Sequence, residues 1–510
     1  MKIFKLNIND KEVSLIVCET LKVYISEKTI VMLKGKTILN KIPVTAEEIA
    51  RAVSSEGVDK VIEKLDGVFS IAIYHGNAIF LGRSIHSGPG LYYCVNDTEI
   101  YVSNTISDIK SWKTNLSCTL NIKMAERYLS GRQTVTNDTL ITNVYKVNNG
   151  EYICFDCKTE PFIYKDEFTV TRKSQSTVDA IISNIEMLQE RREKALLFSG
   201  GLDSALIFHS LKEADNSFSA YHFVSDDSKD SEKEFARQYC VKYGVKFIEV
   251  NKSLDFNEQL YYGLNPSEPD EVPLVFERSD ELDIQQGLKS DELLFLSGHG
   301  GDHIFGQNPS VFFGIDALRD RGLRFMHKKM VEYANLKGRK YKDLLFSNIS
   351  ELKQVRSMRS LAKHSHISDM RLAAAQLFCS DNAGRVNIYT PFLHKNIVQH
   401  YADIPVYELF NQQFDRHPVR SEAFQRFGSD IFMKKTKRSS SQLIFRILSQ
   451  KQDEIKNAIA QSHVTEILDI NDIELNKILY ENTTVRLTLE LPYILNLYRL
   501  AKFMQLQHIE

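Results

Sequence analysis

The sequence predicts a chain of two fold classes, an antiparallel α+β domain followed by a parallel-sheet α/β domain. In the first 168 residues, short β-rich runs are separated by turn residues, as is typical of antiparallel sheets. From about Val178, apolar strands alternate with helical stretches, which is typical of a parallel sheet covered by helices on both faces. The chain has 510 residues, too many for one core, so we expect domains at 1–168 and 178–510 joined by a polar linker, Phe168–Thr177.

Turn residues and helical spacing define the elements of the first domain. Turn-forming tripeptides separate four β-rich runs and predict two hairpins: Val68–Tyr74 with Ala78–Arg83, and Leu91–Val95 with Glu99–Ser103. Strands are also expected at Val13–Val17 and Leu21–Ile25. A helix is expected over Ala46–Leu65, because its apolar residues recur at helical spacing and Thr45 with Glu48 makes a capping box.

Apolar runs predict the strands of the second domain, at Ala195–Phe198, Ala220–Val224, Lys246–Val250 and Leu293–Leu296. Ser231 with Glu234 makes another capping box and predicts a helix between the second and third strands. Beyond Asp316 the carboxy-terminal part reads as mostly helical. Its last helix, Leu487–Leu506, is expected to kink or break at Pro492.

Composition and charge limit the class of protein. Lys plus Arg total 64 and Asp plus Glu total 66, a formal net charge of -2 that gives no indication of a nucleic-acid partner. The first residues, MKIFKLNIND, lack the apolar run of a secretory signal, and no segment approaches the ~20 apolar residues that span a bilayer. Seven scattered cysteines favour a reducing compartment, and Cys154 with Cys157 is a CxxC without a second pair. We expect a cytoplasmic protein without membrane insertion.

A glycine-rich turn follows the first strand expected in the second domain. Leu196–Phe198 leads into Ser199–Ser204, which reads Ser-Gly-Gly-Leu-Asp-Ser. The glycines allow a tight turn whose N–H groups can face one anion, and the helix expected over Ser204–Lys212 directs its positive end to the same place. Asp203 adds a hard oxygen ligand for magnesium. We interpret the turn as a pyrophosphate cradle; the alternative is an ordinary serine-glycine turn of an α/β protein.

A second glycine-rich turn, Ser297–Gly306, follows the strand expected at Leu293–Leu296. Ligands of open parallel sheets bind at the carboxyl ends of the strands, so both turns are expected to face one site. Asp203 and Asp302 would then hold one Mg2+ against the phosphates of a nucleotide, unless Asp302 only forms a turn.

His299 and His303 have the spacing of a zinc-binding pair on a helix. Gly300 and Gly301 oppose a helix between them, however, and no glutamate follows the first histidine. We therefore exclude zinc at this pair.

The pattern at Ser199–Ser204 is that of the ATP pyrophosphatases, which split ATP into AMP and pyrophosphate. The chain resembles the asparagine synthetase superfamily over nearly its whole length. Among the members of that superfamily, it is most similar to the lasso-peptide macrolactam synthetases (lasso cyclases) of the microcin type. In the first domain the resemblance rests on Leu65–Phe69, Gly82–Arg83 and Leu91–Tyr93. In the second it rests on Ser199–Ser204, Ser297–Gly306, Pro391–Leu393, Asp415–Arg416 and Thr436–Lys437.

This resemblance implies an Ntn-hydrolase-like, glutaminase-type domain followed by an ATP-pyrophosphatase (PP-loop) domain. Active glutaminases of this type use an amino-terminal cysteine that is exposed after Met1 is removed. This sequence has Lys2 at that position, and its nearest cysteine is Cys18. We therefore expect a degenerate first domain that serves as a scaffold and does not hydrolyse glutamine.

The resemblance also implies roles for individual residues. His299 is expected to take a proton from the attacking amine, where asparagine synthetases have a glutamate and β-lactam synthetases a tyrosine; a histidine buried for packing is the alternative. Lys437 is expected to contact the acyl-adenylate, with Lys435 as the competing position; the alternatives are a solvated charged loop and a phosphate-binding patch for nucleic acid. The expected ATP-binding residues are Phe198, Ser199, Gly200, Gly201, Asp203, Ser204, Val224, Ser297 and Gly298.

The implied reaction is ATP-dependent amide formation that releases AMP and pyrophosphate, with ATP and Mg2+ as cofactors. An Asp or Glu side-chain carboxylate of a lasso precursor peptide would be adenylated and then attacked by the amino-terminal amine of the same peptide. A leader peptidase of the same pathway is an implied partner. The alternatives are a small-molecule amide or β-lactam synthetase, an asparagine-synthetase-like enzyme without glutaminase activity, an idle binding scaffold, and a tRNA-modifying ATP pyrophosphatase.

Overall fold

The computed structural model describes most of the chain, and all statements below concern these residues. They are 3–7, 13–16, 22–26, 28–40, 42–86, 89–95, 99–112, 119–130, 135–156, 161–168, 176–187, 193–214, 217–224, 231–251, 265–272, 293–346, 361–376, 388–435, 452–470 and 484–509.

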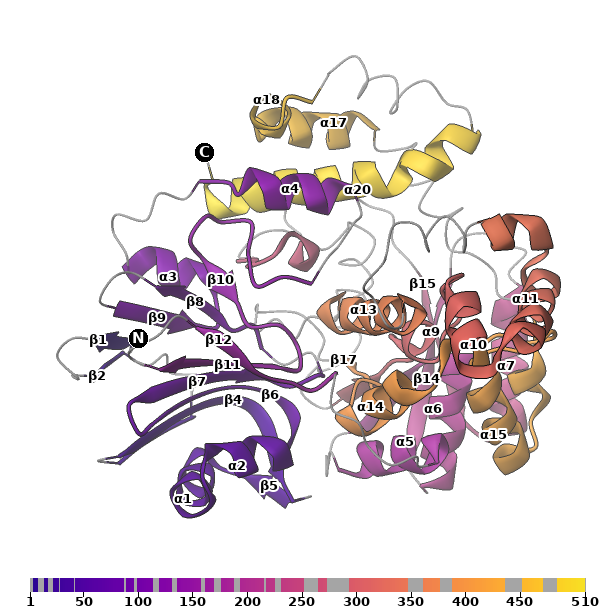
Figure 1. Cartoon of the computed structure of the whole chain (residues 1–510), viewed down its shortest axis with the longest axis horizontal. Helices are drawn as coiled ribbons and strands as arrows, with labels where there is room; N and C mark the ends of the chain where they lie inside the picture. Colours follow the sequence, from indigo (N-terminus) through magenta and orange to yellow (C-terminus); the bar gives the residue numbers. More distant parts are fainter. Residues whose placement is uncertain are drawn as a thin grey trace.

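Two antiparallel sheets form the amino-terminal half (Figure 1). The smaller has the order β10-β8-β9-β1-β2, from Tyr145–Lys146, Tyr92–Val95, Glu99–Ser103, Ile3–Asn7 and Val13–Ile16. The larger has the order β12-β11-β7-β6-β4-β3, from Phe162–Asp166, Glu151–Asp156, Ala78–Arg83, Leu65–His75, Thr29–Leu39 and Lys22–Ile25, with β5 (Ile42–Val44) paired to β4. Apolar residues of both sheets, among them Met32, Leu81 and Val102, form one core between them.

The hairpins expected from the turn residues are present, β6 with β7 and β8 with β9. The single helix expected over Ala46–Leu65 is two helices, α1 (Ala46–Glu56) and α2 (Val58–Lys64). Gly57, at φ +87°, breaks the helical path between them, while the capping box of Thr45 and Glu48 is formed as expected. Both helices pack on the outer face of the larger sheet.

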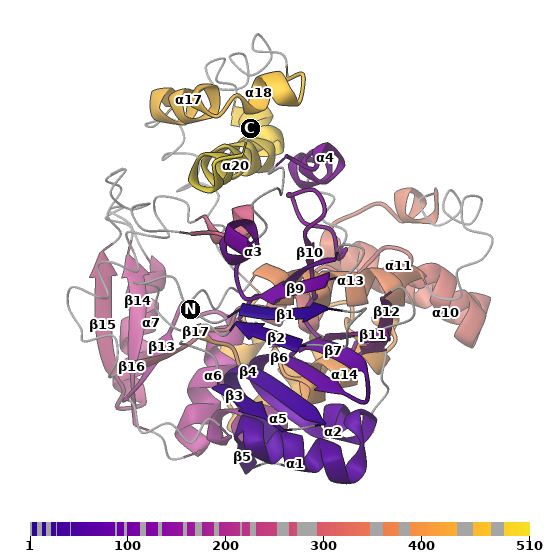
Figure 2. The same cartoon turned by 90° about the vertical axis from the view of Figure 1, so that its left-hand side faces the viewer.

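The second half contains a five-stranded parallel sheet in the order β15-β14-β13-β16-β17 (Figure 2). Its strands are Lys246–Asn251, Phe218–Val224, Glu193–Leu197, Leu293–Leu296 and Ile388–Tyr389. The sequence analysis did not predict β17, which has only two residues and pairs with β16. Together with the antiparallel sheets, this sheet confirms the predicted fold class.

Helices cover one face of the parallel sheet with a large apolar core. They include α5 (Thr177–Glu186), α6 (Leu202–Glu213), α7 (Ser231–Lys242), α14 (Lys395–Asp403) and α15 (His417–Phe427). On the other face the described residues form only a small cluster around Ala195, Tyr221 and Phe295. Within the described ranges, the helices that the sequence predicted on that face are not found.

The other helices belong to both halves of the chain, the first two to the first half and the rest to the second. They are α3 (Ile106–Trp112), α4 (Ile122–Leu129), α9 (Gly301–Ile304), α10 (Phe313–Arg321), α11 (Leu323–Lys337), α13 (Leu361–Gln376), α17 (Gln452–Gln461), α18 (Val464–Ile467) and α20 (Thr484–Gln507), with 3-10 turns η2 (Pro269–Glu271), η4 (Val406–Glu408) and η5 (Asp430–Met433). Helix α20 continues through Pro492 without the expected break. None of the helices in the described ranges has the length and apolar character needed to span a membrane.

The carboxy-terminal helices pack on the amino-terminal half, although the sequence places them with the second domain. In Figure 1, α17 and α18 lie above α20, and α20 runs beside α4. Leu497, Tyr498 and Phe503 of α20 share a buried core with Tyr92 and Ile106. The domain division at 1–168 and 178–510 stays a prediction. The last helix belongs to the second domain by its place in the sequence, but it packs on the first half of the chain.

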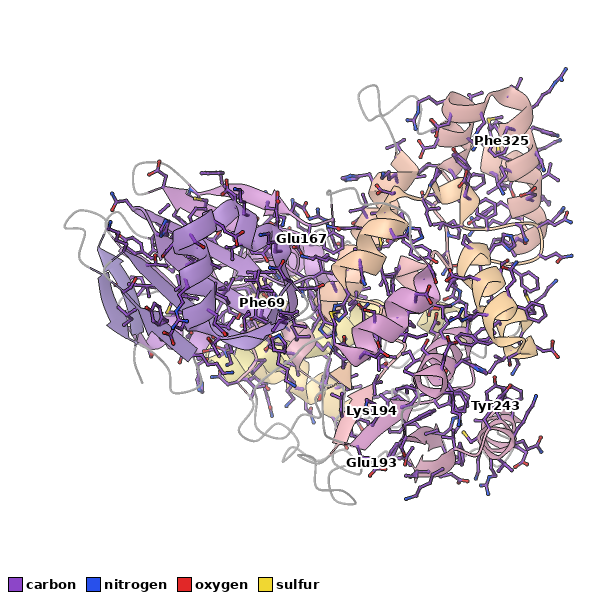
Figure 3. All side chains as sticks on the ribbon, turned by 90° about the horizontal axis from the view of Figure 1, so that it is seen from below. Phe69, Glu167, Glu193, Lys194, Tyr243 and Phe325 are labelled. Atoms are coloured by element: carbon purple, nitrogen blue, oxygen red, sulfur yellow. The ribbon has the colours of Figure 1, made fainter. Side chains whose placement is uncertain are left out.

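A buried polar network joins the two halves beneath β17. The Tyr389 and His86 rings stack at 4.9 Å, and Tyr389 hydroxyl contacts His394 Nε2. His394 Nδ1 lies 3.4 Å from a carboxylate oxygen of Asp66. Lys395 reaches backbone carbonyls of the first domain and lies 4.0 Å from Glu167, which Figure 3 shows at the boundary between the halves.

Candidate active site

The order of the parallel strands creates a crevice at the centre of the sheet. β13 and β16 are neighbours, but the chain continues from β13 toward β14 on one side and from β16 toward β17 on the other. The turns after these two strands therefore diverge, and open α/β sheets bind ligands at such a point. The two glycine-rich turns singled out in the sequence both lie there.

The first turn, Ser199–Ser204, has a backbone that only glycine adopts readily. Gly200 has φ +75°, and a Cβ on it would come within 3.2 Å of the Phe235 ring. Helix α6 begins after Gly201 with no side-chain cap, and Ser204 Oγ donates to the Gly201 carbonyl at 3.1 Å. The first N–H groups of α6 are thus left for an anion, as the cradle interpretation expects.

The second turn lies directly against Asp203 because it contains glycines. A Cβ on Gly298 would lie 2.9 Å from Asp203 Cβ, and one on Gly301 would lie 2.4 Å from Asp203 Oδ1. Any side chain at either position would push the two turns apart. The spacing of glycines in Ser297–Gly306 is therefore explained by close approach to the first turn.

Asp203 and Asp302 lie together, and one guanidinium joins them. Arg416 Nη1 donates to Asp203 Oδ2 at 3.0 Å and to Asp302 Oδ1 at 2.6 Å. Burial works against the charged guanidinium, but the carboxylates of Asp203, Asp415 and Asp302 more than offset it and raise the pKa of Arg416. The two aspartates expected to hold a metal ion are thus brought together around a fixed positive charge.

A cleft of about 470 Å³ opens over these turns. Of the residues expected at the site, it is lined by Phe198, Ser199, Asp203, Ser204, Ser297, Gly298, His299 and Asp302. Gly200, Gly201 and Val224 are not among its lining residues, although Gly200 follows Ser199 and Val224 follows Phe223, which are. Lys437 lies outside the described residues, while the competing Lys435 is exposed, with Nζ 5.4 Å from the centre of the Phe414 ring.

His299 is half-buried at the wall of the cleft and held in one orientation. Its Nε2 donates to the Ala373 carbonyl of α13 at 3.1 Å, so the proton is on Nε2 and the lone pair is on Nδ1. Burial lowers the pKa of His299, opposed in part by the bond to Ala373 and the charge of Asp302. A neutral ring with a free lone pair is what a base near pH 7 requires.

Several residues of the cleft were not expected from the sequence. Tyr221, His222 and Phe223 of β14 line it, and His222 Nδ1 donates to the Phe198 carbonyl at 2.8 Å. Only Val224 had been expected from this strand. Position at the carboxyl end of a predicted parallel strand is the signal that would have included its neighbours.

Arg416 was noted only as part of a motif and given no role. It has φ +52°, a left-handed backbone uncommon for a residue with a side chain, and its side chain is nearly fully buried. No pattern in the sequence connects it to aspartates 213 and 114 positions away. Only the fold brings these groups together.

Comparison with known proteins identifies the group to which this site belongs. The model of one protein family, described as asparagine synthase, matches residues 184–486 and so includes both glycine-rich turns and Arg416. The chain belongs to the asparagine synthase family. As a member of the asparagine synthase family, it is an ATP-dependent, amide-forming ligase.

A curated relative matches over the whole length. The microcin J25-processing protein McjC of Escherichia coli is 61% identical over 510 residues, which cover 100% of this chain and 99% of the relative. This match confirms the resemblance to the microcin-type synthetases within the asparagine synthase family.

Two solved structures share a more distant likeness. The allosteric regulatory enzyme of purine biosynthesis is 10% identical with a TM-score of 0.20, covering 54% of this chain and 70% of that one. The glutamine phosphoribosylpyrophosphate amidotransferase of B. subtilis, complexed with ADP and GMP, is 9% identical with a TM-score of 0.18, covering 56% and 60%. At these scores neither comparison adds to the argument.

Proposed function

We propose that this ligase closes a macrolactam ring in a lasso-peptide precursor by way of an acyl-adenylate. The cleft between two acid-bearing glycine turns carries this proposal, because it offers an anion site, paired carboxylates and a neutral histidine in one place. The relative that processes microcin J25 supports a peptide substrate of this kind.

In the first step, an oxygen of an Asp or Glu side-chain carboxylate of the peptide attacks the α-phosphorus of ATP. The bond between the α-phosphorus and the bridging oxygen breaks, and pyrophosphate leaves. The uncapped start of α6 and the N–H groups of Ser199–Ser204 would hold the departing pyrophosphate. Phe198, Ser297 and Gly298 would contact the nucleotide, as the resemblance implies.

The paired carboxylates fit a magnesium ion. Asp203 and Asp302 are hard oxygen donors that converge on one positive group, Arg416, at 3.0 and 2.6 Å. They are the residues that would hold Mg2+, which when bound neutralises the phosphate oxygens. Arg416 would keep both side chains in place throughout.

In the second step, the amino-terminal amine of the peptide attacks the acyl carbon and forms the amide bond. The bond between the acyl carbon and the phosphate oxygen breaks, and AMP leaves with that oxygen. His299 Nδ1 takes the proton that the amine loses, because Nε2 is already committed to the Ala373 carbonyl. Lys437, or Lys435 in its place, would stabilise the charge that develops in this step; this role rests on the resemblance alone.

A leader peptidase is part of the proposal, since the amine must first be freed. We place the reaction in the cytoplasm, because seven cysteines scattered over the chain favour a reducing compartment. A small-molecule amide synthetase would share the first step but would not need the peptide.

The decisive experiment supplies purified protein with ATP, Mg2+ and leader-free microcin J25 precursor, and identifies the nucleotide products. AMP, pyrophosphate and a peptide lighter by one water are expected. A peptide with an acetylated amino terminus is the matched control, for which pyrophosphate exchange should continue and ring closure stop. Release of ADP and orthophosphate would contradict the proposal.

A further inference from the structure

A second cavity adjoins helix α13 and shares no lining residue with the nucleotide cleft. It encloses about 100 Å³ between the amino-terminal half, the segment around η2, and α13. Its wall on α13 consists of Leu372 and Ala375, next to Ala373, whose carbonyl holds His299. Figure 1 shows α13 between the amino-terminal sheets and α9.

The acidic groups of this cavity have partners. Glu268 forms an ion pair with Lys146 at 3.0 Å, and Asp270 accepts from the Tyr128 hydroxyl at 2.8 Å. Asp138 accepts from the Thr136 hydroxyl at 3.1 Å. The negative charges in the wall are therefore already engaged.

Arg127 is the exception among the charged groups in the wall. It is half-buried on α4 and lines the cavity, yet within the described part of the chain its guanidinium has no ion pair or hydrogen bond. The wall also contains the apolar residues Met124, Val135, Leu140 and Pro269, together with polar Thr136 and Asn148. Because the acidic groups of the wall are engaged by other partners, Arg127 is the cation in this wall that remains for a carboxylate, and the apolar residues beside it favour a carboxylate flanked by apolar groups.

We infer that this cavity binds a carboxylate of the precursor peptide other than the one that is activated, through Arg127. The inference rests on the proposed function and adds a binding subsite to it. The cavity has room for one side chain or a chain terminus, so it would fix one point of the peptide while His299 acts on another.

The spacing of the two sites agrees with a peptide substrate. The two cavities share no lining residue, although Leu372 lines one and the carbonyl of neighbouring Ala373 holds His299 of the other, so a ligand that reaches both must extend from one cavity into the next. A small acid cannot occupy both sites. Holding the chain at a second point also limits the conformations from which ring closure begins, which favours closure.

The test uses leader-free microcin J25 precursor with Arg127→Gln, Arg127→Lys and, as matched control on the exposed side of α4, Lys123→Gln. Arg127→Gln should raise the peptide KM about ten- to a hundredfold, leaving the KM for ATP unchanged, because a hydrogen-bonded charge pair is lost. Arg127→Lys should recover part of the loss, and Lys123→Gln should behave as wild type. Thermal unfolding should not change, since Arg127 supports no other group.

A peptide with a carboxy-terminal amide identifies the source of the carboxylate. If amidation raises the KM for wild type but not for Arg127→Gln, the terminal carboxylate binds; if it has no effect on either, an acidic side chain binds. An unchanged peptide KM in Arg127→Gln would overturn this inference while leaving the proposed function intact. Absence of peptide-dependent pyrophosphate release from wild type would instead defeat the proposed function and the subsite together.

Discussion

Arg416 shows how strongly a single buried side chain can determine a site. Its guanidinium contacts both Asp203 and Asp302, and its own side chain is only 4% exposed. Removal of the positive charge would leave two carboxylates close together, with Asp203 largely buried and Asp302 partly exposed to the cleft. Breaking a buried ion pair on one side is costly for that reason.

We expect Arg416→Met to lower the free energy of unfolding by about 3 kcal/mol, measured by urea denaturation. The double variant Arg416→Met, Asp203→Asn should regain part of this loss, because one of the repelling charges is gone. If the loss in the double variant equals the sum of the losses in Arg416→Met and Asp203→Asn alone, the two side chains are not coupled.

His299 leads to a prediction about pH. Burial lowers its pKa below the ordinary 6.5, so the ring stays neutral and able to accept a proton as the pH falls toward 6.5. The rate of ring closure, measured in single turnovers, should therefore hold down to about pH 6.5 and fall only below it.

For the same residue, His299→Ala should retain ATP–pyrophosphate exchange and slow ring closure by about 10²- to 10⁴-fold. His299→Gln is the control, since its amide can still donate to the Ala373 carbonyl but cannot act as a base. Full activity of the glutamine variant would mean that this side chain only supports α13.

The glycine turns belong to the scale of elements, where the sequence was most informative. Their order after apolar strands predicted a shared site, and β13, β16 and α6 have the expected positions. The reason is local: a strand, a tight turn and a helix are each specified by neighbouring residues. β17, by contrast, has only two residues, too few to show any periodicity. Tyr221 and His222 line the cleft because β14 pairs with β13, and such pairing between distant segments cannot be read from neighbouring residues.

At this scale we predict that Gly301→Ala stops AMP formation, because the added Cβ would lie 2.4 Å from Asp203 Oδ1 and displace it. Gly201→Ala is a useful comparison for folding, since the nearest atom to its added Cβ would be Ser199 Oγ, 3.3 Å away. Equal AMP formation by wild type and Gly301→Ala, measured by chromatography of the nucleotides, would contradict the role given to close approach.

The single helix expected over Ala46–Leu65 was wrong, and the break that was one of two expectations at Pro492 is absent; both outcomes have physical reasons. Gly57 ends α1 because its backbone at φ +87° cannot continue a helix, whatever the apolar spacing around it. Pro492 lies within α20 without ending it. The packing of α20 against the amino-terminal half outweighs the cost of one missing backbone hydrogen bond.

On the scale of the whole molecule, the polar network beneath β17 ties the halves together and should respond to acid. Burial would raise the pKa of Asp66, but contacts with His394, Lys395 and the Gly67 N–H more than offset it and lower the pKa to about 2. A carboxyl group with a depressed pKa stabilises the fold above its unfolded value and loses this effect as the pH falls toward the folded one.

The free energy of unfolding should therefore decrease between about pH 4 and pH 2 in wild type. In Asp66→Asn it should already be lower at neutral pH, by about 2 kcal/mol, and should vary less over that interval. Urea denaturation at a series of pH values compares the two. Parallel curves would show that Asp66 does not couple the halves.

The core shared by α20 and the amino-terminal half leads to one more prediction. Leu497 is fully buried there, so Leu497→Ala should cost about 2–5 kcal/mol of unfolding free energy. Leu318→Ala is the matched control, because Leu318 is 39% exposed on α10. Similar melting curves for the two variants would argue against this core.

The position of α20 also has a consequence for biosynthesis. The first half emerges from the ribosome with the apolar surface around Tyr92 and Ile106 uncovered, and its cover lies at the far end of the chain. At about 5–20 residues per second, the roughly 340 residues that follow take about 20–70 seconds to translate. During that interval the nascent chain exposes an apolar surface, to which we expect chaperones to bind.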